Sequence, residues 1–302
     1  MNDKRILVVG SSNTDMVIKT HSFPCPGETI LGGRFLMNAG GKGANQAVAA
    51  ARLGGLVTFV GKIGDDIFGK QAVQQLEDEG INVDYVVIDP ENPSGVAMIT
   101  VDRKGENSIV VAPGSNGTLS AADFDKAIPL LSDSEFVLMQ LEIPIPTVEH
   151  IASVAASKQK KVVLNPAPAA RLSDELLKSI YILTPNETEA ELLTGIKVTD
   201  EQSALKAARY LHDKGVEIVI ITMGAAGAFL LAEGNHEVIS APKVEPVDTT
   251  AAGDTFNGAL VVALSEGKTI RESIAFANKV AAISVTRPGA QSSVPYRHEI
   301  IN

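Results

Sequence analysis

Short apolar stretches alternate with longer amphipathic stretches along most of the chain. The short stretches are rich in β-branched residues and apolar at consecutive positions, as strands buried on both faces are; they cover residues 5–10, 56–61, 135–140, 161–165, 181–184 and 217–222. The longer stretches have helical periodicity and cover residues 44–53, 68–79, 121–131, 146–157, 174–179, 187–193 and 201–214. This alternation predicts an α/β fold, a three-layer sandwich in which helices flank both faces of a mostly parallel central sheet.

Residues 15–35 and 94–112 interrupt this alternation, because they contain strand and turn patterns without a helical one. Two arrangements are open for them: edge hairpins on the main sheet, or a small β-sheet of their own. No low-complexity linker or internal repeat divides the chain. We therefore expect residues 1–302 to form one domain, from which the two stretches are excursions.

Composition and charge narrow the class of protein. The hydrophobic content of 45% and the charged content of 21% are ordinary for a globular protein in water. A formal net charge of −10, without a basic stripe, argues against a nucleic-acid partner. The lone Cys25 excludes an internal disulfide, and the sequence shows neither a leader pattern nor a long apolar stretch. We expect a cytoplasmic protein that does not associate with a membrane.

The most distinctive run is DTTAAGDTFNG at residues 248–258, directly before an apolar helical pattern. A helix start points free N–H groups outward, and the small residues Ala251, Ala252 and Gly253 would let an anion approach them. Asp254 would then lie beside an anion hole. This pair suits phosphoryl transfer to an alcohol, since the amides take up negative charge and the carboxylate accepts the hydroxyl proton. The alternative is that Asp254 only caps the helix.

Further polar residues follow the predicted strands, where open α/β sheets bind their ligands. Asn13 and Asp15 come after the first strand, and their amide and carboxylate groups suit a sugar, although Asn-Thr-Asp is also a common turn. Glu142 follows the strand at 135–140. It would face the same edge of the sheet, or it is an ordinary surface acid.

The run NAGGKGAN at residues 38–45 has glycines that permit close backbone approach before a helix. It contains Gly41, Lys42 and Asn45, so that a cation and an amide lie about one turn apart. It is not a Walker A loop, which would need glycine in place of Leu36 and serine or threonine directly after the lysine. A plain turn that enters an amphipathic helix is the structural alternative.

Two patterns in the second half involve polar or small residues after strands. Thr184 and Glu187 have the spacing of a capping box, which leaves Asn186 and Glu189 on one helix face without a structural role. The strand at 217–222 ends in a small-residue loop for which a simple β-turn is one interpretation, and this loop contains Thr222, Gly224 and Gly227.

From the first strand to about Tyr296, these motifs, in this order, resemble those of the ribokinase-like (phosphofructokinase B-type) carbohydrate kinases. The resemblance implies that residues of about 14–37 and 94–113 form a small β-sheet lid over the site. It implies ATP-dependent phosphorylation of a sugar, with the 5-hydroxyl of D-ribose as the expected acceptor and D-ribose 5-phosphate and ADP as products. It also implies a homodimer in which the lids of two copies pair.

The resemblance further implies a role for each group of residues. Asp254 is the expected general base, and Ala251, Ala252 and Gly253 form the expected anion hole. The sugar would be bound, beside Asp254, by Asn13, Asp15, Gly41, Lys42, Asn45 and Glu142. The nucleotide would be bound by Asn186, Glu189, Thr222, Gly224, Gly227, Gly253 and Asn278, of which Asn186 and Glu189 would also be associated with Mg²⁺. A monovalent cation, K⁺, would be held mostly by carbonyl groups at Asp248, Thr250, Ser284, Arg287, Gly289 and Ser293.

Other functions stay open at this point. The same chemistry could act on fructose, deoxyribose, a keto-sugar acid or a nucleoside. An aromatic content of 4% without tryptophan leaves little surface for stacking a nucleoside base, whereas Arg34 and Arg103 leave an anionic sugar possible. A non-catalytic module that senses a sugar or nucleotide is the alternative outside catalysis, and Asp254 argues against it. A nicotinamide oxidoreductase would need Gly-x-Gly-x-x-Gly after the first strand, which this chain lacks.

Overall fold

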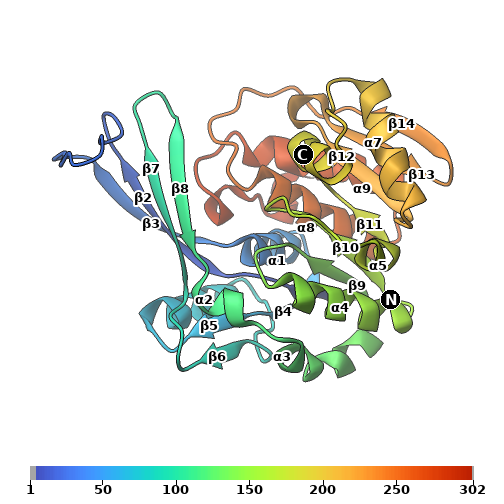
Figure 1. Ribbon diagram of the computed structural model, residues 1–302, viewed down its shortest axis with the longest axis horizontal. Coiled ribbons are helices and arrows are strands. Elements are labelled where there is room, and N and C mark those ends of the chain that lie inside the picture. The colour runs from blue at the N-terminus through green and yellow to red at the C-terminus, as the bar shows by residue number, and fades with distance from the viewer. Residues whose placement is uncertain (1–4, 301–302) are drawn as a thin grey trace.

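The structure, a computed structural model, describes residues 5–300. Within this range the apolar stretches form an eight-stranded sheet in the order β14-β13-β12-β11-β10-β9-β1-β4 (Figure 1). The parallel strands are β1 (Arg5–Val9), β4 (Leu56–Val60), β9 (Ser134–Met139), β10 (Lys161–Leu164), β11 (Ile182–Leu183) and β12 (Ile218–Thr222). An antiparallel hairpin of β13 (Ala228–Ala232) and β14 (Asn235–Ile239) extends the sheet, and the sequence patterns did not predict it.

Helices cover both faces of this sheet. One face packs against α1 (Lys42–Arg52), α2 (Ile67–Asp78), α8 (Ala252–Ser265), α9 (Ile270–Ser284) and α10 (Arg297–Ile300). The other face packs against α3 (Ala121–Asp125), α4 (Ile145–Ser157), α5 (Asp174–Lys178), α6 (Glu187–Thr194) and α7 (Glu201–Asp213). Successive residues of β1 enter opposite cores, as the consecutive apolar positions indicated. The predicted three-layer α/β fold is confirmed.

The helix expected over residues 121–131 is wrong in its length. The chain forms α3 and then a separate 3-10 helix, η2 (Ile128–Ser132). Pro129 lies at the start of η2 and lacks the N–H that a continuous α-helix would need there. The other short 3-10 helices are η1 (Gly114–Thr118), η3 (Gly224–Ala226) and η4 (Gln291–Ser293). Among residues 5–300, no helix has both the length and the apolar character that a membrane span requires.

The two stretches that interrupt the alternation form a separate four-stranded sheet that projects from one side of the layered body (Figure 1). Its order is β3 (Arg34–Gly40), β2 (Asn13–Lys19), β7 (Gly95–Val101) and β8 (Asn107–Ala112). The strands are therefore not edge hairpins of the main sheet. A short parallel pair, β5 (Lys62–Gly64) and β6 (Val87–Asp89), forms a third sheet. That the small sheet acts as a lid stays a prediction.

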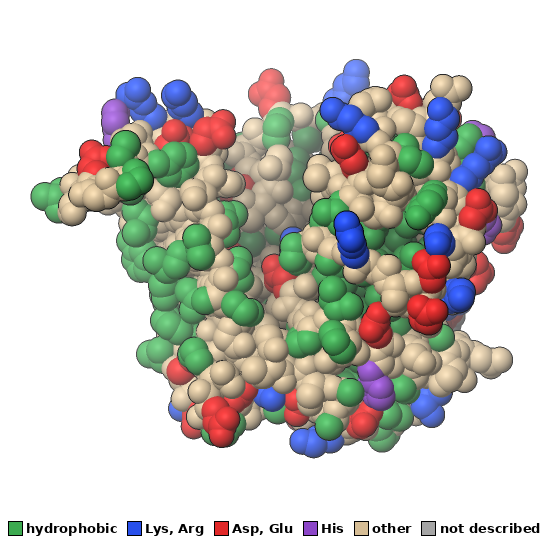
Figure 2. Space-filling model, viewed as in Figure 1, with side chains coloured by type: hydrophobic (Ala, Val, Ile, Leu, Met, Phe, Trp, Pro, Cys, Tyr) green, Lys and Arg blue, Asp and Glu red, His purple; other side chains and the backbone are tan. Residues whose placement is uncertain are grey.

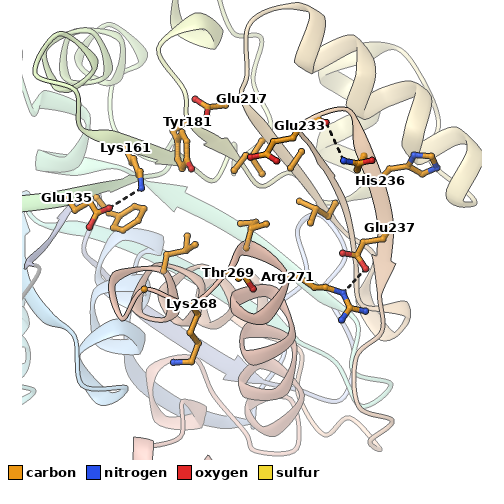
Figure 3. Close-up of a pocket in the computed structure, with 18 residues that line it drawn as sticks. Glu135, Lys161, Tyr181, Glu217, Glu233, His236, Glu237, Lys268, Thr269 and Arg271 are labelled. Atoms are coloured by element: carbon orange, nitrogen blue, oxygen red, sulfur yellow. Dashed lines mark hydrogen bonds and ion pairs between the residues drawn. The ribbon is translucent and has the colours of Figure 1, made fainter.

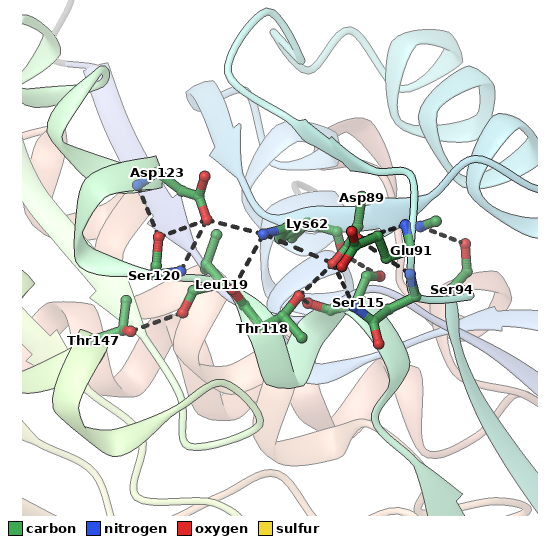
Figure 4. A network of polar contacts seen from close by, with 12 residues as sticks. Lys62, Asp89, Glu91, Ser94, Ser115, Thr118, Leu119, Ser120, Asp123 and Thr147 are labelled. Carbon is green, nitrogen blue, oxygen red and sulfur yellow. Dashed lines mark hydrogen bonds and ion pairs between the residues drawn. The ribbon is translucent and has the colours of Figure 1, made fainter.

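A polar network holds the base of the small sheet to the layered body (Figure 4). Lys62 Nζ donates to the carbonyl oxygen of Thr118 and to Asp123 Oδ2, each at 3.2 Å. Ser94 directly precedes β7, and it donates its N–H and its hydroxyl to the carboxylate of Asp66 at 2.8 and 2.7 Å. Thr118 ends η1, which follows β8. Both ends of the β7–β8 hairpin are thus fixed.

Candidate active site

Polar side chains gather at the carboxyl edge of the main sheet, beside the first turns of α1 and α8. Asn13 follows β1, Glu142 follows β9 and Asn165 follows β10. Figure 2 shows a hollow between the small sheet and the layered body. In open α/β sheets this edge is the usual place for ligands.

Asp254 is buried in the first turn of α8, and both oxygens of its carboxylate are held by side chains of α1. Asn45 Nδ2 donates to Oδ2 at 3.0 Å, and Gln46 Nε2 donates to Oδ1 at 2.9 Å. The N-cap of α8 is Ala251, in a left-handed conformation with φ of 58°. The interpretation that Asp254 only caps the helix is therefore wrong. Burial raises the pKa of Asp254, against the opposing effects of the Lys42 charge and of the two hydrogen bonds.

The backbone at this helix start can receive an anion. The N–H of Ala252 donates to the carbonyl of Thr249 at 3.2 Å, and the N–H of Thr255 donates to the carbonyl of Ala251 at 2.8 Å. Between them, the N–H groups of Gly253 and Asp254 have no hydrogen-bond partner within residues 5–300. A Cβ on Gly253 would meet no atom of residues 5–300 within 4 Å. Two free donors therefore face open space beside the carboxylate.

Lys42, the first residue of α1, is the cation at the centre of four carboxyl groups. Burial lowers the pKa of its ammonium group, but the charges of Asp254, Glu142, Glu189 and Asp15 outweigh burial and raise it overall. The backbone N–H of Lys42 also donates to Glu142 Oε2 at 3.0 Å. Residues from both halves of the sequence are thus brought together, and Lys42 stays charged.

Asp15 lies on β2 of the small sheet, opposite the glycine run. Its carboxylate occupies the space that a Cβ on Gly40 would need. Gly41 has φ of 87°, and a Cβ there would lie 2.7 Å from the backbone nitrogen of Asn13. The glycines of the run therefore serve close approach between strands, as the sequence indicated. Burial, followed by the charges of Glu142 and Asp254, raises the pKa of Asp15 to about 6.

Two asparagines at the site have polar groups left for a ligand. Asn13 Oδ1 accepts from Asn116 Nδ2 at 2.8 Å, and this bond leaves the amide N–H groups of Asn13 as the donors. Asn116 also bridges the backbone N–H and carbonyl of Ser12. Asn45 Oδ1 is buried without a hydrogen-bond partner in the part of the chain that the structure describes. A hydroxyl group of a bound ligand would satisfy it.

The expected capping box of Thr184 and Glu187 is wrong. The N-cap of α6 is Asn186, whose Oδ1 accepts from the N–H of Glu189, while Glu189 Oε2 accepts from the N–H of Asn186, each at 2.8 Å. Thr184 instead donates its hydroxyl to Asn257 Oδ1 at 2.7 Å. Asn186 and Glu189 therefore have a structural role. Burial raises the pKa of Glu189, and its hydrogen bond to Asn186 and the charge of Lys42 oppose this rise. Because the charges of Lys42 and Asp254 both act on it, Glu189 lies near the site.

Two of the residues predicted for the nucleotide, Gly227 and Asn278, meet at the carbonyl of Ile239. Asn278 Nδ2 donates to this carbonyl at 2.8 Å. Gly227 has φ of 101°, and any Cβ there would collide with the same oxygen. Thr222 ends β12, and Gly224 begins η3 with φ of 51° beside open space. The structure thus places the small-residue loop against Asn278.

The residues predicted for a monovalent cation lie on two segments that hydrogen-bond to each other. Asp248 accepts from the N–H of Thr250 and from the N–H of Gly289, each at 2.9 Å, and its own N–H donates to the carbonyl of Val285 at 3.1 Å. Burial raises the pKa of Asp248, but these hydrogen bonds outweigh burial and lower it overall. The segments that precede α8 and follow α9 are therefore held in one arrangement.

The remaining predicted cation residues direct their side chains elsewhere. The guanidinium of Arg287 pairs with Glu299 at 2.8 Å. The hydroxyls of Ser284 and Ser293 donate to carbonyls three residues earlier, at 2.9 and 2.8 Å. Of these three residues, only the backbone carbonyls remain as ligands for the predicted cation. Carbonyl groups are the kind of ligand that the resemblance implied.

A different open cavity, of about 670 Å³, lies at the amino edge of the same sheet (Figure 3). Four of its charged side chains form ion pairs, Lys161 with Glu135 at 3.0 Å and Arg271 with Glu237 at 2.8 Å. None of the predicted site residues lines it. The carboxyl edge, where the predicted residues gather, is therefore the candidate active site.

A buried carboxylate beside two free amide donors suits the transfer of a phosphoryl group to a hydroxyl group of a small molecule. The profile of pfkB family carbohydrate kinases matches residues 3–297, and the chain belongs to this family. The family resemblance is thereby confirmed.

Individual relatives are similar over almost their whole length. The chain is 50% identical to a ribokinase of Haemophilus influenzae, over 99% of this chain and 97% of the relative. It is 40% identical to a deoxyribokinase of Salmonella typhimurium, over 96% and 95% of the two chains. The structure of Arabidopsis thaliana ribokinase complexed with ribose and ATP matches with a TM-score of 0.92, at 35% identity, covering 99% of this chain and 97% of that one.

Proposed function

We propose that this protein transfers the γ-phosphoryl group of ATP to the 5-hydroxyl of D-ribose and so forms D-ribose 5-phosphate and ADP. The observation that carries the proposal is the place of Asp254, a buried carboxylate beside the free N–H groups of Gly253 and of its own backbone. Similarity to ribokinases, one of them solved with ribose and ATP, supports ribose as the acceptor.

The sugar would lie between the small sheet and α1. Lys42 and the amide of Asn13 would donate to its hydroxyl oxygens, whereas Asp15, Glu142 and the unpartnered Asn45 Oδ1 would accept from its hydroxyl groups. Such a ring of groups positions the substrate, and positioning makes up most of the catalysis of phosphoryl transfer.

Asp254 would act as the general base. The 5-hydroxyl oxygen forms a bond to the γ-phosphorus of ATP, the bond from that phosphorus to the β–γ bridging oxygen breaks, and the hydroxyl proton passes to Asp254. Since burial raises the pKa of this carboxylate, it is a stronger base than an exposed one. The N–H groups of Gly253 and Asp254 would stabilise the charge on the phosphoryl oxygens.

Thr222, Gly224, Gly227 and Asn278 would contact the nucleotide. Asn186 and Glu189 fit a metal-associated role, because a carboxylate and an amide oxygen are hard donors and Mg²⁺ keeps most of its waters. Mg²⁺ would neutralise part of the phosphate charge.

Asp248 and the carbonyls of its neighbouring segment would hold K⁺ and keep the start of α8 in shape. Turnover should therefore rise when K⁺ replaces tetramethylammonium in the buffer, and Asp248→Ala should reduce this activation. Identical rates with both cations would contradict the K⁺ site.

The test of the main proposal is a coupled ADP-release assay over a panel of acceptors: D-ribose, deoxyribose, fructose, a keto-sugar acid and adenosine. D-ribose should give the highest kcat/KM, and Asp254→Asn should lower kcat at least ~100-fold without unfolding the protein. Asp213→Asn, at an exposed aspartate of α7, is the matched control and should keep the wild-type rate. A higher kcat/KM for another acceptor would contradict the proposal that ribose is the substrate. Wild-type turnover by Asp254→Asn would contradict the proposal that Asp254 is the general base. A sensing module would bind these ligands without turnover.

We also propose a homodimer formed through the small sheet. The strand register places Met16, Met37, Met98 and Val110 in one row across all four strands, on the face opposite Asp15. Met37, Met98 and Val110 are 46%, 49% and 68% exposed. A row of exposed apolar side chains is unusual on a free surface and typical of an interface. This row gives the dimer its contact face.

Light scattering tests the dimer. Met98→Lys should yield a monomer, because it places a charge in the apolar row. Leu192→Lys, at a residue of α6 that is also 49% exposed, should remain dimeric. A wild-type mass of a single chain would refute the proposal.

A further inference from the structure

Gln46 connects the proposed base to the strands of the main sheet. It is fully buried on α1, and each of its polar groups has a partner. Its Nε2 donates to Asp254 Oδ1 at 2.9 Å and to Asn165 Oδ1 at 3.1 Å. Its Oε1 accepts from Gln140 Nε2 at 2.6 Å. None of these three amide residues was among the predicted site residues.

The same chain of hydrogen bonds continues to the backbone of the anion hole. Asn165 Nδ2 donates to the carbonyl of Thr184 at 3.1 Å. The hydroxyl of Thr184 donates to Asn257 Oδ1 at 2.7 Å, and Asn257 Nδ2 donates to the carbonyl of Gly253 at 2.8 Å. All of these side chains are at most 6% exposed. One buried network therefore reaches both the carboxylate of Asp254 and the peptide group that carries its N–H.

The direction of every hydrogen bond in this network is determined. If the Gln46 amide were flipped, its oxygen would face the side-chain oxygens of Asp254 and Asn165, and its N–H groups would face the N–H donor of Gln140. Neither arrangement makes a hydrogen bond. Asn165 and Asn257 are fixed in the same way, because each uses its oxygen for one neighbour and its N–H for the next. A chain that points one way is polarised along its length, so each bond strengthens the next.

We propose that Gln46 is a positioning residue for phosphoryl transfer, and that the network from Gln140 to Asn257 holds the base and the anion hole in a fixed relative position. This inference rests on the proposed function. The donor from Asn257 on the carbonyl of Gly253 polarises the peptide group, which makes the N–H of Asp254 a better donor to a phosphoryl oxygen. Gln46 is not among the residues proposed to contact the sugar or the nucleotide, and it would act through Asp254.

Gln46→Met tests the inference, since methionine has a similar volume but cannot donate to Asp254. We expect kcat to fall about 10- to 100-fold, because a misplaced base loses the reacting geometry. KM for ribose and for ATP should stay within about threefold, since the sugar and nucleotide contacts are kept. The acid limb of the pH–rate profile should move to higher pH, because a hydrogen bond that favours the charged carboxylate is removed.

Three further variants separate positioning from general loss of structure. Thr147→Val removes a buried hydrogen bond to the carbonyl of Leu119 outside the network, and it should lower stability without changing kcat. Thr184→Val breaks the branch to the anion hole, and it should lower kcat without moving the acid limb. Gln46→Glu keeps the side-chain volume and the oxygen that accepts from Gln140, and it replaces the methionine variant if that variant does not fold. It should move the acid limb of the pH–rate profile to still higher pH, because two neighbouring carboxyl groups then compete for negative charge.

The outcomes distinguish this inference from the proposed function. If Gln46→Met keeps the wild-type kcat and pH profile while Asp254→Asn is inactive, the positioning role is wrong and the proposed reaction stands. If the wild-type protein does not phosphorylate ribose, the proposed function fails. The Asp254 titration, followed by carboxyl-carbon NMR and assigned with Asp254→Asn, then decides the inference alone: it should move upward in Gln46→Met, and an unchanged titration overturns it.

Discussion

Replacing Gly253 with alanine separates the folding role of this residue from its proposed role in catalysis. Gly253 is the second residue of α8 and does not have a positive φ, so alanine can adopt its backbone conformation. A Cβ at this position would meet no atom within 4 Å. We expect the new methyl group to restrict the space beside the N–H groups of Gly253 and Asp254, where the phosphoryl oxygens are expected.

The two effects have opposite signs. Alanine in place of glycine in a helix stabilises the folded state by about 0.4–1 kcal/mol, since the unfolded chain has less conformational freedom to lose. For a chain of this size that raises Tm by about 1–3 °C. Loss of one donor to a developing negative charge costs about 3–4 kcal/mol, and kcat should therefore fall about 10²–10³-fold.

The assay pairs thermal unfolding with steady-state turnover on Gly253→Ala and on a control, Gly117→Ala. Gly117 also lacks a positive φ, and a Cβ there would make only an ordinary contact with Pro113, 3.5 Å away. The control should keep the wild-type kcat. Undiminished turnover by Gly253→Ala would refute the role of these N–H groups as an anion hole. A large loss of stability would show that the space beside Gly253 is not open.

Two further predictions concern Asp15 and the nucleotide loop. Burial raises the pKa of Asp15 to about 6, above the value of about 3.9 in an unfolded chain, so its contribution to stability is complete below about pH 4 and is lost as pH rises towards 6. Urea denaturation across this window should show that loss in the wild type but not in Asp15→Asn, and parallel curves would contradict it. Gly227→Ala should destabilise the protein by more than about 2 kcal/mol through its collision with the carbonyl of Ile239, whereas Gly224→Ala should cost only about 1 kcal/mol of backbone strain. Equal unfolding midpoints for the two variants would show that Gly227 does not pack tightly against the carbonyl of Ile239.

The parts of the site that the sequence predicted are those encoded locally. Asp254 and Lys42 each lie in a short run of small residues at a helix start. Glu142 lies just after β9, and Asp15 lies at the start of β2, the strand that follows β1 along the chain. Because strand ends of a parallel sheet meet at one edge, this placement is visible without the structure.

The parts that the sequence did not predict depend on distant partners. Thr184 and Asn186 are both good N-caps with a glutamate three residues later, and the local pattern does not choose between them. The choice follows from the bond of Thr184 to Asn257, 73 residues away. Gln46 likewise bonds to residues 94, 119 and 208 positions away, and in sequence it is only a polar residue among alanines.

The split placement of the proposed sugar-binding residues would have a thermodynamic consequence. Asp15 belongs to the projecting sheet, whereas Lys42 and Asn45 belong to the layered body. If the small sheet is the predicted lid, ligand affinity and the orientation of that sheet form a single linked equilibrium, in which each strengthens the other by the same factor. We therefore predict that a substitution at Lys62 or Ser94, which hold the base of that sheet, lowers the affinity for ribose.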